Sequence, residues 1–354
     1  MQQSASIGLI KTINIGDYVM KLTTKLAVTT AVLVSFTAPQ VFADTQWNVS
    51  LWGKRRAFTE HVEKLAELVS AKTNGEFTLN ISYGGLSSNT ENLDGISFGA
   101  FEMAQFCAGY HPDKNPSITV LELPFMGVST LEQEIAVSKA VYNHPAVVKD
   151  LARWNAKLLM PSPLPQYNIA GVGDAPNSLS DFKGLRIRAT GGIGEALTIA
   201  GAVPTSMSAT EVRQALDSGV INAASFAPHA HMSFGTVESA DWWTTNLNPG
   251  TVNCPVVVNV DSLADLKPEY RDALLGSVDE SLAHYVDYYN NQTMAAWGPK
   301  LDEKGVERIT LSAAELKAFK DQAAGPVHNA WIDSMNKKKL PAQELYDLVL
   351  ETLK

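Results

Sequence analysis

Short runs rich in β-branched and aromatic residues alternate with longer amphipathic segments along most of the chain, and this alternation constrains the fold more than any other feature. Residues 58–69 place apolar side chains at helical spacing, and residues 77–83 then alternate as a strand does. Residues with the spacing of a capping box mark further helix starts at 129–132, 208–211 and 312–315. The pattern predicts an α/β architecture.

Two crossing points divide this pattern into two lobes. Three closely spaced prolines interrupt regular structure before residues 166–172, which we interpret as a strand that leaves one lobe and enters the other. Residues 255–260 are expected to form the return crossing, and the helical pattern over residues 269–296 is too long for one small lobe. We therefore expect a first lobe of residues 44–165 and 255–293, and a second lobe of residues 166–254 and 294–354.

Residues 20–43 have the three parts of a secretory signal peptide: a cationic start, an apolar middle over residues 26–36, and small or apolar residues before Ala43. The apolar run of about eleven residues reaches across roughly half of a bilayer core, so a cleaved signal fits better than a retained membrane helix. We expect cleavage after Ala43 and export of the mature chain; the periplasm as its destination is implied by the family resemblance described below. Residues 1–19 precede a second start methionine, Met20, and are interpreted as a start-site artefact.

An excess of acidic residues excludes one class of partner. The chain has 28 Lys and Arg against 37 Asp and Glu, which gives a formal charge of -9 at pH 7. Binding to a phosphate backbone requires a basic surface, so we expect no nucleic-acid partner.

Sequence motifs for several kinds of catalysis are missing. The chain contains no His-Glu-x-x-His metal motif and no Gly-Lys-Ser/Thr phosphate loop, and Gly192-Ile193-Gly194 does not continue into a dinucleotide-binding fingerprint. We therefore expect a protein that is not an enzyme, with no catalytic residue and no cofactor.

The cysteines and two histidines leave alternatives open. After export, Cys107 and Cys254 would meet an oxidising compartment, where they form either a disulfide or two buried free thiols. A nucleophilic pair of Cys107 with His111 lacks an identifiable orienting group. His229 and His231 would lie on one side of an extended chain as part of a metal site, but a third ligand is missing nearby, so we expect hydrogen-bonded or solvent-facing histidines and no metal.

Two segments and their surroundings carry a family resemblance. The run KGLRIR at 183–188, followed by SATEVRQALDSGVIN at 208–222, resembles the DctP-type substrate-binding proteins of TRAP transporters, as do Leu123-Pro124-Phe125 and the export signal. The likeness covers most of the mature chain. It implies a two-lobed α/β periplasmic binding protein of the Venus-flytrap type, with crossing strands and a long helix that spans both lobes. Such proteins close on an organic acid and deliver it to an ion-driven membrane permease.

The resemblance also implies an anchor for the ligand. Arg188 would bind the ligand carboxylate with two parallel hydrogen bonds, because the planar guanidinium fork matches a carboxylate. Many acid-binding relatives carry a second arginine near residues 166–168, and this sequence has none there. The cations that follow the first strand, among them Arg55 and Arg56, are candidates to supply the missing positive charge from the other lobe.

Aromatic and amide side chains complete the predicted site. Aromatic residues in loops around the expected cleft would close over the rest of the ligand or, alternatively, pack the lobes together. The loop amides would contact the ligand or satisfy the backbone. The aromatic candidates are Trp52, Tyr167, Phe226 and Trp242, and the amide candidates are Asn89 and Gln105.

We therefore expect a periplasmic solute-binding protein of a TRAP transporter that captures a small organic anion, a carboxylate or a sulfonate, as a monomer, and passes it to the membrane permease subunits. One alternative is a binding protein for a zwitterionic compatible solute, a betaine or an ectoine-like compound, in an aromatic pocket. Others are a secreted enzyme built on the same scaffold, and a ligand-sensing partner of a membrane receptor.

Overall fold

A computed structural model describes residues 44–354. The expected start-site segment at 1–19, the signal peptide at 20–43 and the cleavage after Ala43 lie outside the described residues. Among the helices of residues 44–354, none combines the length and the apolar character needed to cross a membrane.

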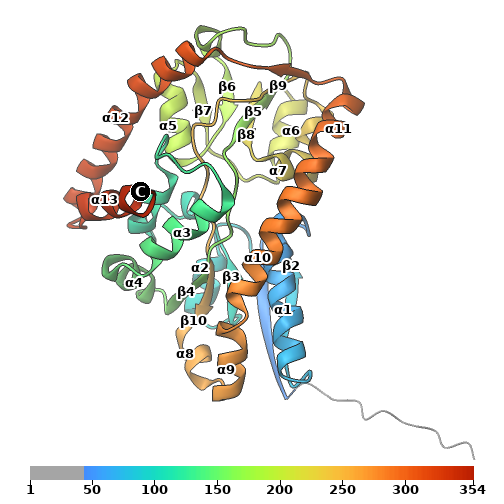
Figure 1. Cartoon of the computed structure of the whole chain (residues 1–354), viewed down its shortest axis with the longest axis vertical. Helices are drawn as coiled ribbons and strands as arrows, with labels where there is room; N and C mark the ends of the chain where they lie inside the picture. Colours follow the sequence, from blue (N-terminus) through green and yellow to red (C-terminus); the bar gives the residue numbers. More distant parts are fainter. Residues whose placement is uncertain (1–43) are drawn as a thin grey trace, which may run out of the picture. The chain divides into compact units, whose positions relative to one another are not determined.

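The first of two sheets has five strands in the order β2-β1-β3-β10-β4 (Figure 1). Strand β1 is parallel to its neighbours β2 and β3, whereas β10 is antiparallel to β3 and β4 and enters the sheet from much later in the chain. The strands are β1 (Thr45–Leu51), β2 (Phe77–Tyr83), β3 (Met103–Gln105), β4 (Ala156–Met160) and β10 (Val256–Asn259).

The second sheet has six strands in the order β11-β9-β5-β8-β6-β7. Strand β8 is parallel to β6 and antiparallel to β5, so the sheet is mixed, like the first. Its strands are β5 (Asn168–Gly171), β6 (Arg186–Arg188), β7 (Val203–Thr205), β8 (Ala223–Phe226), β9 (Trp242–Thr244) and β11 (Glu307–Ile309). Two mixed sheets with helices around them confirm the predicted α/β class.

The helix predicted over residues 269–296 starts where expected, but it is interrupted at Gly276 and its second part continues beyond residue 296. Helix α9 (Pro268–Leu275) stops at Gly276, and a new helix starts after it, continues through a π-helical turn at Tyr289–Thr293, and ends at Gly305. A Cβ at Gly276 would lie 2.8 Å from the carbonyl oxygen of Asp272, so this position requires glycine. Figure 1 shows the second helix, α10 (Val278–Tyr288) and α11 (Met294–Lys304), as one long rod that passes beside both sheets.

Helices pack on both sheets and around their junction. Helix α1 (Glu60–Lys72) packs on β2 and α10, and the last helix, α13, packs on α3. The residue assignment of the two lobes stays a prediction. The remaining helices are α2 (Asn92–Ser97), α3 (Leu131–Tyr142), α4 (Pro145–Ala152), α5 (Gly191–Ile199), α6 (Val212–Asp217), α7 (Pro228–Ser233), α8 (Val260–Asp265), α12 (Ala313–Lys337) and α13 (Ala342–Thr352).

Candidate ligand-binding site

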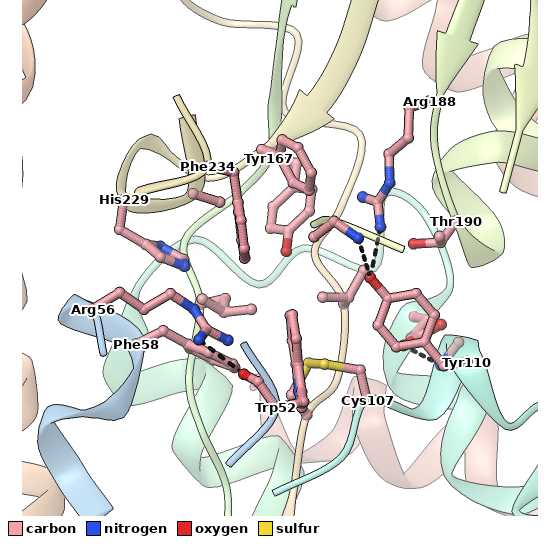
Figure 2. Close-up of a pocket in the computed structure, with 18 residues that line it drawn as sticks. Trp52, Arg56, Phe58, Cys107, Tyr110, Tyr167, Arg188, Thr190, His229 and Phe234 are labelled. Atoms are coloured by element: carbon pink, nitrogen blue, oxygen red, sulfur yellow. Dashed lines mark hydrogen bonds between the residues drawn. A yellow bond between two sulfur atoms is a disulfide. The ribbon is translucent and has the colours of Figure 1, made fainter. Parts of the chain in front are cut away.

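A cavity lies where strands of both sheets end (Figure 2). Its walls come from the segments that follow β1 and β3 in the first sheet, and from the ends of β6 and β8 in the second. About 430 Å³ between these walls is free of atoms, but only about 30 Å³ admits the centre of a water molecule. The side chains therefore close tightly on one another, and a small organic molecule fits only if they move apart.

Arg188 ends strand β6 and extends into this cavity with 3% of its surface exposed. Its Nε and Nη2 each donate to the carbonyl oxygen of Met207 at 3.2 Å, and Nη2 also donates to the hydroxyl of Tyr110 at 2.9 Å. Its Nη1 donates to the carbonyl oxygen of Ser225 at 3.4 Å, and the guanidinium lies 4.4 Å from the ring centre of Phe226. All these acceptors are neutral, so a carboxylate would form stronger hydrogen bonds with the same donors.

Arg56 reaches the same cavity from the loop after β1, with 7% of its surface exposed. Its Nη1 donates to the carbonyl oxygens of Trp52 at 3.0 Å and Lys54 at 2.7 Å. Its Nε and Nη2 find no acceptor among residues 44–354. Burial lowers the pKa of Arg56 to about 10, so the side chain is still a cation at neutral pH.

Aromatic rings from both sheets meet across the cavity. The ring of Trp52, after β1, stacks on Phe234, after α7, with the planes 3° apart and the centres 6.2 Å apart. Phe58 likewise stacks on His229 of α7 at 5.5 Å. Tyr167 joins them on the segment that leads into β5. The rings give the middle of the cavity flat apolar walls.

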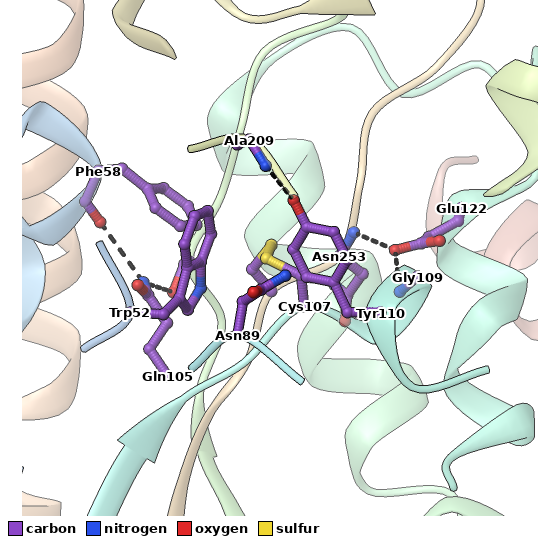
Figure 3. Close-up of a disulfide and its surroundings, with 12 residues drawn as sticks. Trp52, Phe58, Asn89, Gln105, Cys107, Gly109, Tyr110, Glu122, Ala209 and Asn253 are labelled. Carbon is purple, nitrogen blue, oxygen red and sulfur yellow. Dashed lines mark hydrogen bonds between the residues drawn. A yellow bond between two sulfur atoms is a disulfide. The ribbon is translucent and has the colours of Figure 1, made fainter. Parts of the chain in front are cut away.

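Glu122 closes the side of the cavity near Arg188. Its Oε1 accepts hydrogen bonds from the backbone N–H groups of Gly109 at 3.1 Å and Asn253 at 3.0 Å (Figure 3). A Cβ at Gly191, the first residue of α5, would lie 2.5 Å from Oε2 of Glu122, so the close approach depends on glycine. Burial raises the pKa of Glu122 to about 7, although the two backbone hydrogen bonds and Arg188 oppose the shift.

A disulfide joins Cys107 and Cys254 in the cavity wall (Figure 3). The structure thus decides between the two alternatives left open by the sequence, and a free Cys107 nucleophile is ruled out. His111 instead lies 3.0 Å from the backbone oxygen of Asn89 and 2.9 Å from Oδ1 of Asn92, and burial lowers its pKa to about 4.

Five of the nine predicted site residues line the cavity together. Four aromatic and cationic side chains join Arg188 there: Trp52, Arg56, Tyr167 and Phe226. Phe58, Tyr110, Glu122 and Phe234 also line the cavity but were not predicted from the sequence. Each of them fits an ordinary helix, core or loop position, so nothing in the local sequence marks it as a site residue.

The other four predicted residues lie outside the cavity lining. The side chain of Arg55 is 65% exposed and pairs with Glu63. Asn89 accepts a hydrogen bond from Ser208 at 3.3 Å. Gln105 is fully buried and donates to the hydroxyl of Ser162 at 2.9 Å.

Trp242, the fourth of these residues, packs into the core of the second sheet. A Cβ at Gly171 would collide with its ring. Trp242 is not among the residues that line the cavity.

The histidines of residues 229–231 lie on helix α7, so the predicted extended chain is wrong there. Pro228 occupies the first helical position, where its missing N–H has no cost. His229 shares a hydrogen bond with Tyr289, and His231 shares one with Thr236. Within residues 44–354, no three His, Cys, Asp or Glu side chains come together as metal ligands.

The sequence also contains one pattern that is typical of a catalytic serine and was not predicted above. Gly95-Ile96-Ser97-Phe98-Gly99 has the Gly-x-Ser-x-Gly spacing of a nucleophile elbow, which needs the serine on a sharp strand-to-helix turn. Here Ser97 is the last residue of α2 and lies outside the cavity lining. The pattern has no structural context for catalysis.

Comparisons with known proteins agree with this geometry. A family model described as "Bacterial extracellular solute-binding protein, family 7" (DctP) matches residues 49–334. A monocarboxylate 2-oxoacid-binding periplasmic protein of Nostoc sp. is 25% identical over 338 residues, which cover 87% of this chain and 91% of that protein.

Solved structures of TRAP solute-binding proteins share the fold. A marine metagenome protein specific for aromatic acids, solved with metahydroxyphenylacetate, has a TM-score of 0.79 at 22% identity and covers 87% of this chain and 98% of its own. The Bordetella pertussis receptor DctP7, which binds pyroglutamic acid, has a TM-score of 0.73 at 21% identity, and the match covers 86% of this chain and 99% of that receptor. A Rhodoferax ferrireducens protein in complex with benzoate has a TM-score of 0.78 at 18% identity, and the match covers 87% of this chain and 97% of that protein. The expected two-lobed binding-protein fold is confirmed.

Proposed function

We propose that this chain, which belongs to the DctP family of bacterial extracellular solute-binding proteins, is the periplasmic receptor of a TRAP transporter. The receptor would capture a small organic acid in the cavity between its two sheets. The observation that carries the proposal is the buried guanidinium of Arg188, which extends into that cavity and contacts only neutral acceptors among the described residues.

Arg188 would hold the carboxylate of the ligand. The carbonyl oxygens of Met207 and Ser225 and the ring of Phe226 already fix the orientation of the guanidinium. A ligand carboxylate would replace the hydroxyl of Tyr110 on Nη2, and a charged acceptor in an enclosed site forms the stronger hydrogen bond. The surrounding rings would cover the apolar part of the acid.

A carboxylate is favoured over a sulfonate as the anionic group. The Nostoc relative binds monocarboxylate 2-oxoacids, and the solved structures hold pyroglutamate, metahydroxyphenylacetate or benzoate, all of them carboxylic acids. The ligand would be released unchanged to the membrane permease, and the receptor would act as a monomer.

A zwitterionic solute with a quaternary ammonium group fits the cavity less well. A quaternary ammonium group binds against the faces of aromatic rings. Here the faces of Trp52, Phe58 and Phe234 surround the guanidinium of Arg56, at 4.4, 5.2 and 5.4 Å from its central carbon. A second cation at these rings would be repelled by the first.

A thermal-shift panel on residues 44–354 tests the proposal. The panel contains mono- and dicarboxylates, their sulfonate analogues, glycine betaine and ectoine. A compound that binds the folded protein raises its melting temperature, because a ligand at 100 times its Kd stabilises the folded state by about 2.7 kcal/mol. We expect carboxylates to raise the melting temperature. Arg188→Ala should weaken binding of the best acid by about 3–5 kcal/mol, since the ligand charge is left enclosed and unpaired.

Arg186→Ala is the matched control. Arg186 lies two residues earlier on the same strand but is exposed and donates to Asn222. Its replacement should leave the acid affinity unchanged. Stabilisation by betaine or ectoine alone, or full acid binding by the Arg188→Ala protein, would contradict the proposal.

A further inference from the structure

Arg56 has two donors that nothing in the described part of the chain accepts. Its Nε and Nη2 are buried and unpartnered, and no Asp or Glu among residues 44–354 lies within ion-pair distance of its guanidinium. The neighbouring Arg55 takes the nearby acidic partners, Glu60 and Glu63. The guanidinium also lies against the rings of Trp52, Phe58 and Phe234, but burial of a cation without a counter-ion is unfavourable, and a well-packed apolar side chain of similar volume avoids that cost. The arrangement is therefore poor as a structural feature and suits an anion that arrives from outside.

The two buried guanidinium groups approach the cavity from different sheets. Arg56 follows β1 of the first sheet, and Arg188 ends β6 of the second. Figure 2 shows them on opposite sides of the group of rings that includes Tyr167 and Phe234. The arginines therefore offer two separate cationic ends with flat apolar walls between them.

The acidic group of the cavity belongs to the Arg188 end. Glu122 receives its hydrogen bonds from Gly109 and Asn253 and packs against Gly191. Arg188 is the cation that opposes the pKa shift of this carboxyl group. Glu122 therefore leaves the charge of Arg56 uncompensated.

We propose, on the basis of the function proposed above, that Arg56 is a second anion site in this cavity and that the preferred ligand is a small acid with two anionic groups, one for each guanidinium, joined by a short or flat apolar spacer. Arg56 then determines specificity: it distinguishes a diacid from the monoacid with the same skeleton. The unpartnered Nε and Nη2 would donate to the second anionic group.

Isothermal titration calorimetry with matched acids tests this role. Benzoate is compared with terephthalate and isophthalate, and butyrate with glutarate, because the members of each set differ by one carboxylate. The wild-type protein should bind at least one diacid more tightly than its monoacid partner. In Arg56→Met, which keeps an apolar side chain of similar length, the affinity for that diacid should fall at least about 100-fold and the affinity for the monoacid less than about fivefold.

Arg55→Met is the control for general charge, since Arg55 is exposed and lies outside the cavity lining. It should change neither affinity by more than about twofold. An equal loss of monoacid and diacid binding in Arg56→Met, or no loss at all, would overturn the role of Arg56 while the function of Arg188 still stands. Failure of every carboxylate in the thermal-shift panel to stabilise the wild-type protein would overturn both.

The free protein supplies a second readout. If the charge of Arg56 awaits a ligand, the Arg56→Met protein should melt at or above the wild-type temperature in the absence of any acid. A variant that melts well below the wild type, or fails to fold, would show that Arg56 is a structural cation and would contradict the proposal.

Discussion

Two buried carboxyl groups, Glu122 and Glu134, contrast with the cations of the cavity. Both residues are buried, and burial raises the pKa of Glu122 to about 7 and that of Glu134 to about 8. The folded protein therefore holds these protons at pH values at which an unfolded glutamate, with a pKa near 4.5, has lost them. Their contribution to stability is complete below pH 4.5 and decreases as the pH rises toward 7 to 8.

Glu134→Gln tests this assignment at a residue that lies outside the cavity lining. The wild-type protein should lose more stability between pH 5 and pH 8 than the variant, by about 1–3 kcal/mol, because glutamine cannot ionise. Urea unfolding at both pH values measures the difference. Glu132→Gln, at an exposed position of the same helix, is the control. Identical pH dependence in all three proteins would show that Glu134 is ionised in the folded state.

The sequence predicted the two arginines of the cavity correctly but did not identify all of the uncharged residues around them. Arg188 was predicted from the family resemblance, and Arg56 from the need for a second positive charge; the structure brings both to one cavity. Ligand contact by either residue stays a prediction. Gln105 and Trp242 could not be separated from these residues, because at the end of a short strand the sequence does not show which side chains turn toward the cavity and which turn into the core.

Among the elements of the first sheet, the disulfide reinforces the pairing of β3 with β10. Strands β3 and β10 are already antiparallel, with Gln105 opposite Val256, and the disulfide joins Cys107 and Cys254, two residues beyond each. It closes a loop with a sequence separation of 147 residues. A cross-link of this length restricts the unfolded chain strongly.

The double variant Cys107→Ser, Cys254→Ser should lose about 3–5 kcal/mol of unfolding free energy, because the unfolded chain regains the entropy of the open loop. Guanidinium unfolding measures the loss. Reduction of the wild-type protein with dithiothreitol should cause a similar loss and should leave the variant unchanged. Equal stability of the oxidised wild type and the variant would mean that the cross-link contributes nothing.

Element boundaries were predicted unevenly. The capping box at residues 312–315 is confirmed, with Ser312 and Glu315 bonded to each other's backbone N–H. The helix start predicted at 129–132 is shifted by one residue, because Thr130 accepts from Gln133 N. Both pairs fit the motif, and the choice between adjacent hydroxyl residues depends on the packing of the helix, which the local sequence does not encode.

On the scale of the whole molecule, net charge and local charge have opposite signs. The chain carries a formal charge of -9, yet its cavity holds two buried arginines. Overall composition therefore gives an expectation against nucleic acid but no information on the ligand, since ligand binding depends on the charges that face the ligand.

The proposed binding of a ligand in the cavity would be coupled to movement of the two sheets. The lining of the cavity comes from both sheets, and its free space is small. A ligand that contacts both sides favours the closed arrangement over any more open one by its differential affinity. The residue pattern predicted the α/β class and the crossing strands, and the family resemblance predicted the two-lobed fold. Which rings meet across the cavity depends on how the two sheets are arranged, and periodicity along the chain does not reveal this arrangement.

We propose that a small organic acid binds between the sheets with its carboxylate on Arg188. A crystal structure of the protein with the tightest-binding acid of the panel would show whether it does. We expect both oxygens of the carboxylate to accept hydrogen bonds from the guanidinium of Arg188, inside the cavity shown in Figure 2. An acid bound elsewhere, with Arg188 still contacting only Met207, Tyr110 and Ser225, would contradict it.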